Sequence, residues 1–365
     1  MKNTFGSSIS VTLFGESHGP YIGAVLDGLA PGIEIDEEYI KLKLSKRRPS
    51  GKISTARVEA DNFQIVSGVF NSRTTGTPLT ILIPNENTRS SDYAKTSFIP
   101  RPAHADFTAE CKYHGFQDPR GGGHFSGRIT AALVAAGAII SSALSKKGIK
   151  IGTHIKKLAG ESDREFLDIK EDINTLSDLS FPVLDAEATQ RMLNLAEETA
   201  ALGDSIGGVL ETAVVGIPKG VGEPWFDSVE GVLSHILFSV PAVKGVEFGS
   251  GFGFADMCGS EANDAFYTDG KEIFTKSNNN GGINGGITNG MPIFFRTAIK
   301  PTPSIYKVQE SVDVSRMENT NLKIEGRHDP MIVHRAAAVI DAAVAIAVAD
   351  LLAVRYGTDF LSEKL

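Results

Sequence analysis

The chain has 365 residues, of which 41% are hydrophobic and 22% are charged, and its formal net charge is −8 at pH 7. This length and composition predict a soluble globular protein with a large core. The acidic balance argues against a general nucleic-acid-binding protein, because neutralising phosphates requires a broad basic surface.

The first half of the chain alternates short strands with helices. Residues 9–14 form an apolar run that predicts a strand leading into the segment 15–19. Asp36 is the expected N-cap of a helix that ends near Lys46, with Ile35 and Ile40 placed as a hydrophobic staple. The pattern then predicts strands at 63–69 and 79–83, and helices at 105–113 and 129–147.

The second half begins with the least informative region, residues 149–203, of which only 185–201 reads as an amphipathic helix. Beyond it we expect a half-buried strand at 208–217, a helix at 228–239, a glycine-rich stretch at 245–290, a strand at 291–299 and a last helix after 326–330. No linker, composition break or regular βαβ spacing divides the chain. We therefore predict one α+β domain that spans residues 1–365.

Two apolar segments, the two cysteines and the N-terminus indicate the cellular compartment of the protein. Residues 129–144 are too few for a membrane span, and 336–354 carry Asp341 and Asp350, so both predict buried helices and no membrane is expected. Cys111 and Cys258 have no metal or redox spacing, and the N-terminus lacks the apolar core of a signal peptide. These features predict a cytoplasmic protein without disulfides.

A basic island stands out in this acidic chain. Residues 46–57 carry five positive charges and no acid. Such a loop can bind a phosphate or a polyanion, although a solvated positive face is the plainer alternative. Three further segments, 15–19, 101–106 and 120–128, combine basic groups with glycines or small residues.

Two histidines and one glycine loop carry the candidate chemistry. His18 and His104 lie in loops, where an imidazole can donate or accept a proton near neutral pH. The glycines 121–123 open onto a helix and can cradle an anion, but they match neither a Walker loop nor a dinucleotide-binding fingerprint. The turn 300–304 offers an ammonium group and two hydroxyls for a phosphate. Ordinary tight turns remain the alternative for both loops.

A metal site is not expected. His104, Asp106, His328 and Asp329 could form one, but no helical HExxH or Cys/His pattern supports it. A salt-bridged helix entry is the plain reading of the run 327–329. From the residues alone, we predict a cytoplasmic enzyme that binds one or more phosphorylated small molecules.

The motifs together resemble the chorismate synthase family. They include Phe-Gly-Glu-Ser-His-Gly at 14–19, Arg-Pro-Ala-His-Ala-Asp at 101–106 and Arg-Gly-Gly-Gly at 120–123. The other matching segments, all in family order, are 47–49, 89–93, 203–208, 241–245, 281–287, 300–302 and 326–330. The resemblance covers essentially the whole chain.

The resemblance implies a fold, a reaction and an assembly. The expected fold is a β-α-β sandwich of antiparallel sheets around central helices, assembled as a homotetramer. The expected reaction converts 5-enolpyruvylshikimate 3-phosphate to chorismate by a 1,4-anti elimination of phosphate. Reduced FMN is the implied cofactor, although the reaction has no net redox change.

The resemblance also assigns roles to residues. His18 would act as an acid near the substrate phosphate, His104 would protonate or polarise the reduced flavin, and Asp329 would assist proton removal. The implied substrate-binding residues are Ser17, Arg47, Arg48, Lys52, Arg57, Arg101 and Arg128. The implied cofactor-binding residues are His124, Phe125, Ser126, Pro241, Ala242, Gly285, Lys300, Pro301, Thr302, Pro303, Ser304 and Arg327.

Four departures from the common family pattern affect these roles. Ala103 replaces a frequent Gly, and because a left-handed Ala costs roughly 1–2 kcal/mol we expect a negative φ there. His-Phe-Ser-Gly at 124–127 replaces Arg-Ser-Ser-Ala, so the flavin contacts at 124–126 depend most on the resemblance. Lys52 stands where many relatives have Arg, and Met331 where many have Cys.

Two other functions remain open at this stage. One is a flavin-dependent oxidoreductase acting on a phosphorylated small molecule; the other is an anion- or RNA-binding module. Some members of the family reduce their own flavin with NADPH. Because no added nucleotide-binding domain is visible, we expect an external flavin reductant or an NADPH-dependent reductase as partner.

Overall fold

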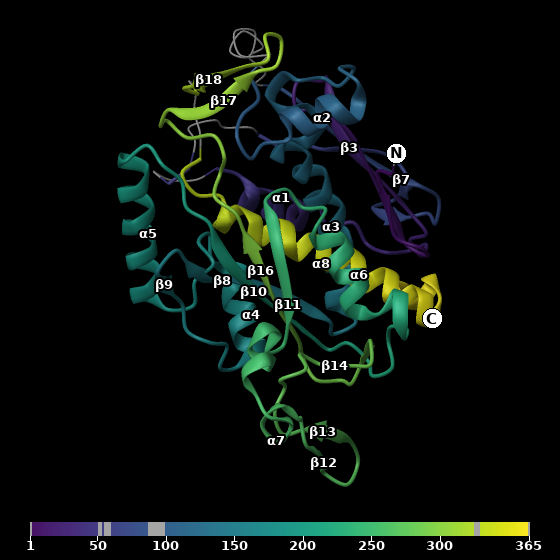
Figure 1. The fold of residues 1–365 in the computed structure, drawn as a ribbon. Coiled ribbons are helices and arrows are strands. Elements are labelled where there is room, and N and C mark those ends of the chain that lie inside the picture. Colours follow the sequence, from purple (N-terminus) through teal and green to yellow (C-terminus); the bar gives the residue numbers. More distant parts are fainter. Residues whose placement is uncertain (1, 50–52, 55–59, 87–98, 325–328, 364–365) are drawn as a thin grey trace.

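The computed structural model describes residues 2–49, 53–54, 60–86, 99–324 and 329–363, and Figure 1 shows two β-sheets with helices between them. The first sheet contains β1 (Thr4–Phe5), β2 (Ser10–Gly15), β3 (Tyr21–Asp27), β7 (Leu79–Pro84) and β4 (Gln64–Ser67), in that order. The second contains β11 (Val243–Phe248), β16 (Ile293–Ile299), β10 (Gly208–Val215), β8 (Lys150–Leu158) and β9 (Glu161–Ser162). Every strand pair in both sheets is antiparallel.

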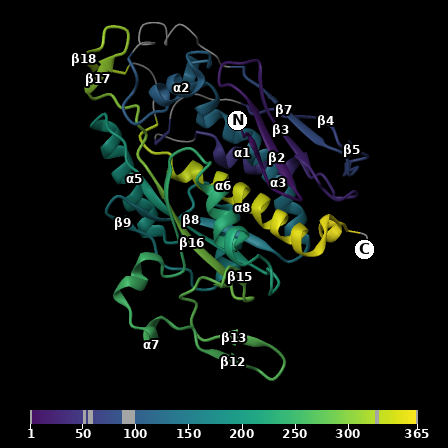
Figure 2. The ribbon, with the colours of Figure 1, turned by 45° about the vertical axis from the view of Figure 1, so that its right-hand side comes forward.

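Three helices fill the layer between the sheets (Figure 2). They are α1 (Glu37–Arg47), α3 (Thr130–Lys146) and α8 (Val333–Tyr356). Helix α3 packs on β3 and β7 of the first sheet, α8 packs on β8 and β10 of the second, and the two helices pack against each other. One cluster of buried apolar residues runs through both sheets and all three helices. The predicted α+β sandwich of antiparallel sheets around central helices is therefore confirmed.

The remaining elements lie around this sandwich. The helices are α2 (Asp106–Tyr113), α4 (Ile169–Asp178), α5 (Ala186–Ala201), α6 (Val229–Leu237) and α7 (Gly259–Ala262). Short 3₁₀ turns are η2 (Arg120–Phe125), η3 (Gly127–Ile129), η4 (Trp225–Asp227), η5 (Gly251–Asp256) and η6 (Thr358–Leu361). Four hairpins pair β5 (Val69–Phe70) with β6 (Arg73–Thr74), β12 (Phe266–Thr268) with β13 (Ile273–Thr275), β14 (Ile283–Asn284) with β15 (Ile287–Thr288), and β17 (Gln309–Asp313) with β18 (Glu318–Leu322).

Helix starts follow the capping chemistry of the sequence. The Asp36 carboxylate accepts a hydrogen bond from the Tyr39 amide at 2.9 Å, which confirms it as the N-cap of α1. Asp185 caps α5 in the same way, and Ser228 caps α6. Ile35 and Ile40 are both buried, as a hydrophobic staple requires.

The two central helices are apolar because they are surrounded by protein. The segment Gly127–Lys146 and α8 are both long and apolar enough to cross a membrane, yet most of each lies buried inside the structure. At their crossing, a Cβ built on Gly137 of α3 would lie 2.5 Å from the Ala342 Cβ of α8. Glycine therefore allows the two backbones to approach closely.

The second sheet differs from the sequence expectation in two respects. Strand β10 was expected to be half-buried, but six of its eight residues are buried. The reason is that α8 covers one face of the sheet and α4 the other. Strand β8, its neighbour, falls in the region where the sequence predicted no strand, because its polar residues interrupt any alternating pattern.

One of those polar residues is buried within an ionic network. His154 of β8 is fully buried, with Nδ1 2.7 Å from an Asp163 oxygen and Nε2 3.1 Å from a Glu211 oxygen. Burial by itself lowers the pKa of His154, but its hydrogen bonds to the two carboxylates outweigh burial and the pKa is raised. This network is structural, since it lies inside the second sheet.

The N-terminal segment is fastened to the last helix. The carboxylate of Asp350 in α8 accepts hydrogen bonds from the backbone amides of Ser7, Ser8 and Ile9 at 2.7–3.1 Å. The turn that leads into β2 therefore depends on a residue near the other end of the chain.

Candidate active site

The glycine loop lies at the centre of the candidate site. Gly121, Gly122 and Gly123 of η2 have φ values of +60°, +83° and +53°. A Cβ at Gly123 would lie 2.1 Å from the Asp118 carbonyl oxygen, so only glycine fits there. The Gly123 carbonyl accepts a hydrogen bond from the Ser17 amide at 3.0 Å, which joins this loop to the loop after β2.

His18 and Ser17 pack against the first glycine of this loop. Both side chains are buried, and a Cβ on Gly121 would lie 2.4 Å from His18 Cε1 and 2.9 Å from Ser17 Oγ. Asn85 holds their turn by donating to the carbonyl oxygens of Glu16 and Gly19 at 2.9 and 2.7 Å. Ser17 Oγ is buried and has no hydrogen-bond partner among the described residues, so it can bind a ligand oxygen.

His104 packs against the second glycine. A Cβ on Gly122 would lie 3.2 Å from His104 Cε1 and 3.4 Å from Nε2. The other ring nitrogen, Nδ1, lies 2.6 Å from an Asp106 carboxylate oxygen. The structure thus brings the two predicted histidines against adjacent residues of one loop.

Asp106 also binds Arg101. The Arg101 Nε and NH2 groups donate to the two carboxylate oxygens at 2.8 and 2.7 Å. Burial by itself raises the pKa of Asp106, but hydrogen bonds from Arg101 and His104 outweigh it and hold the pKa well below its usual range. Arg101 is therefore engaged by this ion pair. From the sequence, Asp106 was considered only as a possible metal ligand and not as a partner of Arg101 and His104.

The prediction for Ala103 is wrong. Its φ is +58°, in the left-handed region. The tight turn before His104, closed by a 3.2 Å hydrogen bond from the His104 amide to the Arg101 carbonyl, requires this conformation. The energetic argument was sound, but the strain is retained because the turn is held from outside by the Lys300 ammonium, which donates to the Ala103 carbonyl.

Three of the predicted substrate-binding arginines gather around one carboxylate. Arg47 and Arg48 contact an Asp61 oxygen at 3.4 and 3.5 Å, and Arg128 binds its other oxygen. Arg47 and Arg128 are buried, and so is Asp61, which has a φ of +51°. Three guanidinium groups against one carboxylate leave two positive charges, so this cluster attracts anions.

The arginine cluster is also held by neutral groups. Arg47 donates from Nε to Thr130 Oγ1 at 3.0 Å and from NH2 to the Gly127 carbonyl at 2.9 Å. Arg128 donates to Asn85 Oδ1 at 2.9 Å. The sequence could not reveal Asp61, because nothing in the local sequence distinguishes it from the neighbouring acid Glu59.

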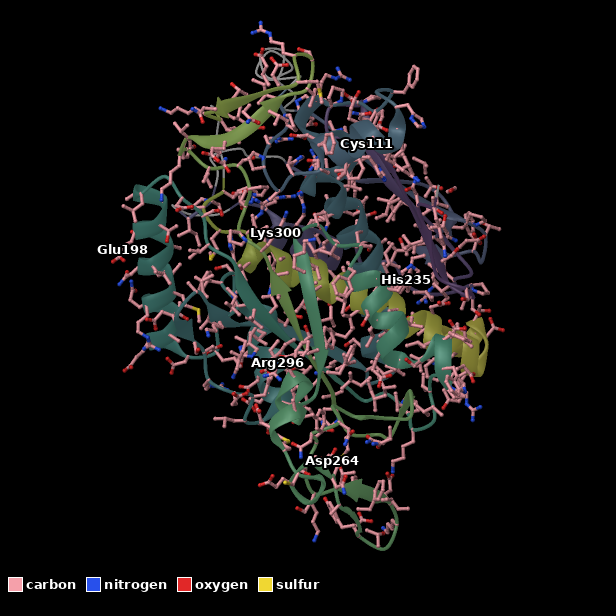
Figure 3. The ribbon with its side chains drawn as sticks, in the orientation of Figure 1. Cys111, Glu198, His235, Asp264, Arg296 and Lys300 are labelled. Atoms are coloured by element: carbon pink, nitrogen blue, oxygen red, sulfur yellow. The ribbon has the colours of Figure 1, made fainter. Side chains whose placement is uncertain are left out.

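The turn after β16 lies beside the turn before β11. The Lys300 amide donates to the Ala242 carbonyl at 2.9 Å, which places 300–304 against Pro241 and Ala242. Burial, together with the nearby Lys244, lowers the pKa of Lys300. Thr302 Oγ1 is buried without a hydrogen-bond partner among the residues described, and its carbonyl accepts from Ser205 Oγ at 2.7 Å. Figure 3 shows Lys300 at the end of the second sheet that lies nearer to α2.

Some predicted cofactor residues have structural partners. His124 Nδ1 donates to the Gly15 carbonyl at 2.8 Å, and Ser126 Oγ accepts from the Arg128 amide at 3.3 Å. The Phe125 ring makes an edge contact with Tyr113 at 6.0 Å. Gly285 lies in the β14–β15 hairpin, at the end of the second sheet away from Lys300 (Figure 1). Within a single chain, Gly285 therefore does not lie beside the other predicted cofactor-binding residues.

Asp329 is held by a residue that the sequence did not single out. Arg335, in the first turn of α8, donates to an Asp329 oxygen at 2.6 Å and to the Arg47 carbonyl at 2.7 Å. This links Asp329 to the arginine cluster. The neighbouring His334 is buried, and burial together with Arg335 lowers its pKa to about 3, so its ring is neutral. Lys52, Arg57, Arg327 and His328 lie outside the described residues.

A cavity of about 210 Å³ between α1, α3, α4 and α8 lies apart from these groups. Its charged side chains already have partners in its own wall. Lys46 donates to the Leu176 carbonyl at 3.0 Å, and Lys43 pairs with Asp341 at 3.7 Å. Neither His18 nor His104 lines it, so we place the chemistry at the glycine loop. In the described part of the chain, no group of three or more His, Cys, Asp or Glu side chains could hold a metal ion.

Comparisons with known proteins agree with this arrangement. The chorismate synthase family model matches residues 9–353. A chorismate synthase of Dehalococcoides mccartyi is 46% identical over 354 residues, covering 96% of each chain, and one of Thermococcus gammatolerans is 45% identical over 347 residues, covering 95% of this chain and 96% of the relative. A crystal structure of chorismate synthase superposes with a TM-score of 0.74 at 29% identity, covering 97% of this chain and 94% of the other.

The sandwich fold, the paired histidines and these matches define the class of the protein as a lyase that eliminates phosphate. Within that class, the chain belongs to the chorismate synthase family. The family is one of flavin-dependent enzymes that act on a small molecule.

Proposed function

We propose that this protein converts 5-enolpyruvylshikimate 3-phosphate to chorismate by a 1,4-anti elimination of phosphate, with reduced FMN as its cofactor. Family membership over nearly the whole chain supports the proposal. The observation that carries it is the pairing of His18 and His104 on adjacent glycines, beside Lys300.

The residues present are suited to a phosphorylated flavin. Thr302 Oγ1 and Ser17 Oγ are buried hydroxyls without hydrogen-bond partners among the described residues. Burying an unpaired hydroxyl costs free energy unless a bound ligand forms the missing hydrogen bond. Lys300, beside Thr302, carries the positive charge that a phosphate requires. We propose that Pro241, Ala242 and the turn 300–304 hold the cofactor next to the glycine loop.

The chain's own residues then have distinct tasks. The elimination releases phosphate with the electron pair of the C–O bond, and the C–H proton departs from the opposite face. His18 donates a proton to the departing phosphate, whose charge the arginine cluster stabilises. When bound, reduced FMN would supply transient electron density and accept the proton, with no net redox change. Asp329, held by Arg335, completes the polar wall on the side of the arginine cluster.

The test is anaerobic turnover of 5-enolpyruvylshikimate 3-phosphate with chemically reduced FMN, following chorismate and phosphate together. Equal release of both, with flavin still reduced at the end, is the expected result. Stoichiometric oxidation of flavin by the substrate would instead establish a flavin-dependent oxidoreductase. A protein that binds the substrate and RNA alike, with a steep loss of binding in salt and no turnover, would be an anion-binding module.

We further propose a cytoplasmic homotetramer whose flavin is reduced by an external reductant or an NADPH-dependent reductase. Cys111 and Cys258 are free and exposed, as suits a reducing compartment. Large exposed aromatic side chains, namely Trp225, Phe226, Phe252 and Phe266, are between 68% and 93% exposed in the single chain. Exposed apolar surface of this kind supports contacts between copies.

A further inference from the structure

Asp106 is placed to choose which nitrogen of His104 carries the proton. Its Oδ1 atom lies 2.6 Å from His104 Nδ1, and the Arg101 NH2 group lies 3.1 Å from the same nitrogen. A carboxylate can only accept a hydrogen bond, whereas a guanidinium can only donate one. The two neighbours therefore demand opposite tautomers of the neutral ring.

The carboxylate wins this competition because it lies 2.6 Å from Nδ1, against 3.1 Å for Arg101, and an unprotonated nitrogen would repel a carboxylate oxygen at that distance. Arg101 also pairs with this carboxylate. Its NH2 group donates to Asp106 Oδ1 at 2.7 Å and its Nε donates to Oδ2 at 2.8 Å. The Arg101 backbone amide also donates to Oδ2 at 3.0 Å. Three donors fix the carboxylate in place, so Oδ1 stays directed at His104 Nδ1.

We propose that Asp106 is a positioning residue that holds neutral His104 in the Nδ1–H tautomer, with Nε2 presented to the site beside Gly122. A free imidazole favours the other tautomer, so the protein must impose this one. Nε2 then accepts a proton when the ring is neutral and donates it back when the ring is charged. One nitrogen thereby serves both directions of transfer. The role in turnover rests on the proposed function, whereas the tautomer does not.

The direct test is nitrogen-15 NMR of histidine-labelled full-length protein without flavin, at a pH where His104 is neutral. His104→Gln identifies the signal among the eight histidines of the chain. Wild type should show protonated Nδ1 and unprotonated Nε2. In Asp106→Ala, Arg101 is released and donates to Nδ1, so the tautomer should switch to Nε2–H. Asp106→Asn keeps an oxygen acceptor and should retain the wild-type tautomer.

Asp172→Ala is the matched control. Asp172 forms the same two-pronged pair with Arg164, at 2.9 and 2.6 Å, but lies in α4, away from the glycine loop. It should leave the His104 signals unchanged. Unchanged signals of the other histidines in Asp106→Ala exclude a general loss of folding. Wild-type His104 in the Nε2–H form, or an unchanged tautomer in a folded Asp106→Ala variant, would overturn the proposal.

Kinetics give the second measurement. Asp106→Ala should lower kcat at least tenfold with less than a threefold change in KM, and Asp106→Asn should recover part of the loss. Equal losses in Asp106→Asn and Asp106→Ala, with a changed KM, indicate instead that Asp106 serves only to hold Arg101. If wild type itself has no turnover, the proposed function fails while the NMR result still decides the tautomer.

Discussion

At the scale of single residues, the site depends on the absence of a side chain at Gly121 and Gly122. Each glycine leaves space for an imidazole ring, and their positive φ values turn the loop so that it faces both rings. A methyl group at Gly121 would displace the His18 ring, and one at Gly122 would press on the His104 ring at 3.2 Å. The loop is therefore the template that fixes the spacing of the two histidines.

Substituting Gly121→Ala should impair turnover more than folding. The new Cβ would lie 2.4 Å from His18 Cε1 in a backbone conformation with φ of +60°, so the ring must move. We expect at least a tenfold fall in kcat, measured under the anaerobic conditions above. Gly160→Ala is the control, because its Cβ would meet nothing within 4 Å. Full activity in Gly121→Ala would show that the position of His18 is not needed.

The sequence predicted the candidate residues but not their partners. His18, His104, Lys300 and the glycine loop carry chemistry that is visible in a motif. Asp61 and Arg335 act on residues far away in the chain, so no local pattern identifies them. The prediction of a negative φ at Ala103 was wrong for the same reason. Lys300, which belongs to a different element, stabilises the left-handed turn at Ala103.

At the scale of elements, the crossing of α3 and α8 is limited by one residue. A Cβ on Gly137 would lie 2.5–2.6 Å from the Cβ, Cα and carbonyl oxygen of Ala342. Gly137→Ala must push the helices apart and should lower the free energy of unfolding by about 1–3 kcal/mol. Urea denaturation measures this. Gly259→Ala in α7, where a Cβ meets nothing within 4 Å, should change stability little.

The buried His154 network should make stability depend on pH. Because its pKa is raised in the folded state, protonated His154 contributes stability that is fully present below its unfolded pKa of about 6.5. That contribution is lost as the pH rises through the folded-state pKa. Wild type should therefore lose stability above about pH 6.5 more steeply than His154→Gln, by urea denaturation at a series of pH values. Parallel curves for the two proteins contradict the prediction.

Helices and strands could be predicted where residues close together in the sequence determine where they start. The caps at Asp36, Asp185 and Ser228 set helix starts that the structure reproduces. Strand β8 was missed because its buried polar residues are stabilised by partners on other elements, as His154 is. Burial of β10 on both faces likewise follows from α4 and α8, which a strand pattern does not reveal.

At the scale of the whole molecule, the exposed aromatic side chains predict association. Replacing both Trp225 and Phe226, which are 86% and 93% exposed, with Ser should leave the fold intact and yield smaller species. Sedimentation velocity over a range of concentrations measures this, with circular dichroism as the check on folding. Wild-type protein that sediments as a monomer at micromolar concentration would contradict the tetramer.

The hydrogen bonds from Ser7 and Ser8 to Asp350 have a consequence for synthesis. They join residues 343 and 342 positions apart, and α8 also contributes to the core that both sheets share. During translation, α3 can cover the first sheet, but the apolar surfaces of α3 and of β8 that pack on α8 stay uncovered until this last helix leaves the ribosome. We therefore expect a nascent chain that lacks α8 (Val333–Tyr356) to bind chaperones.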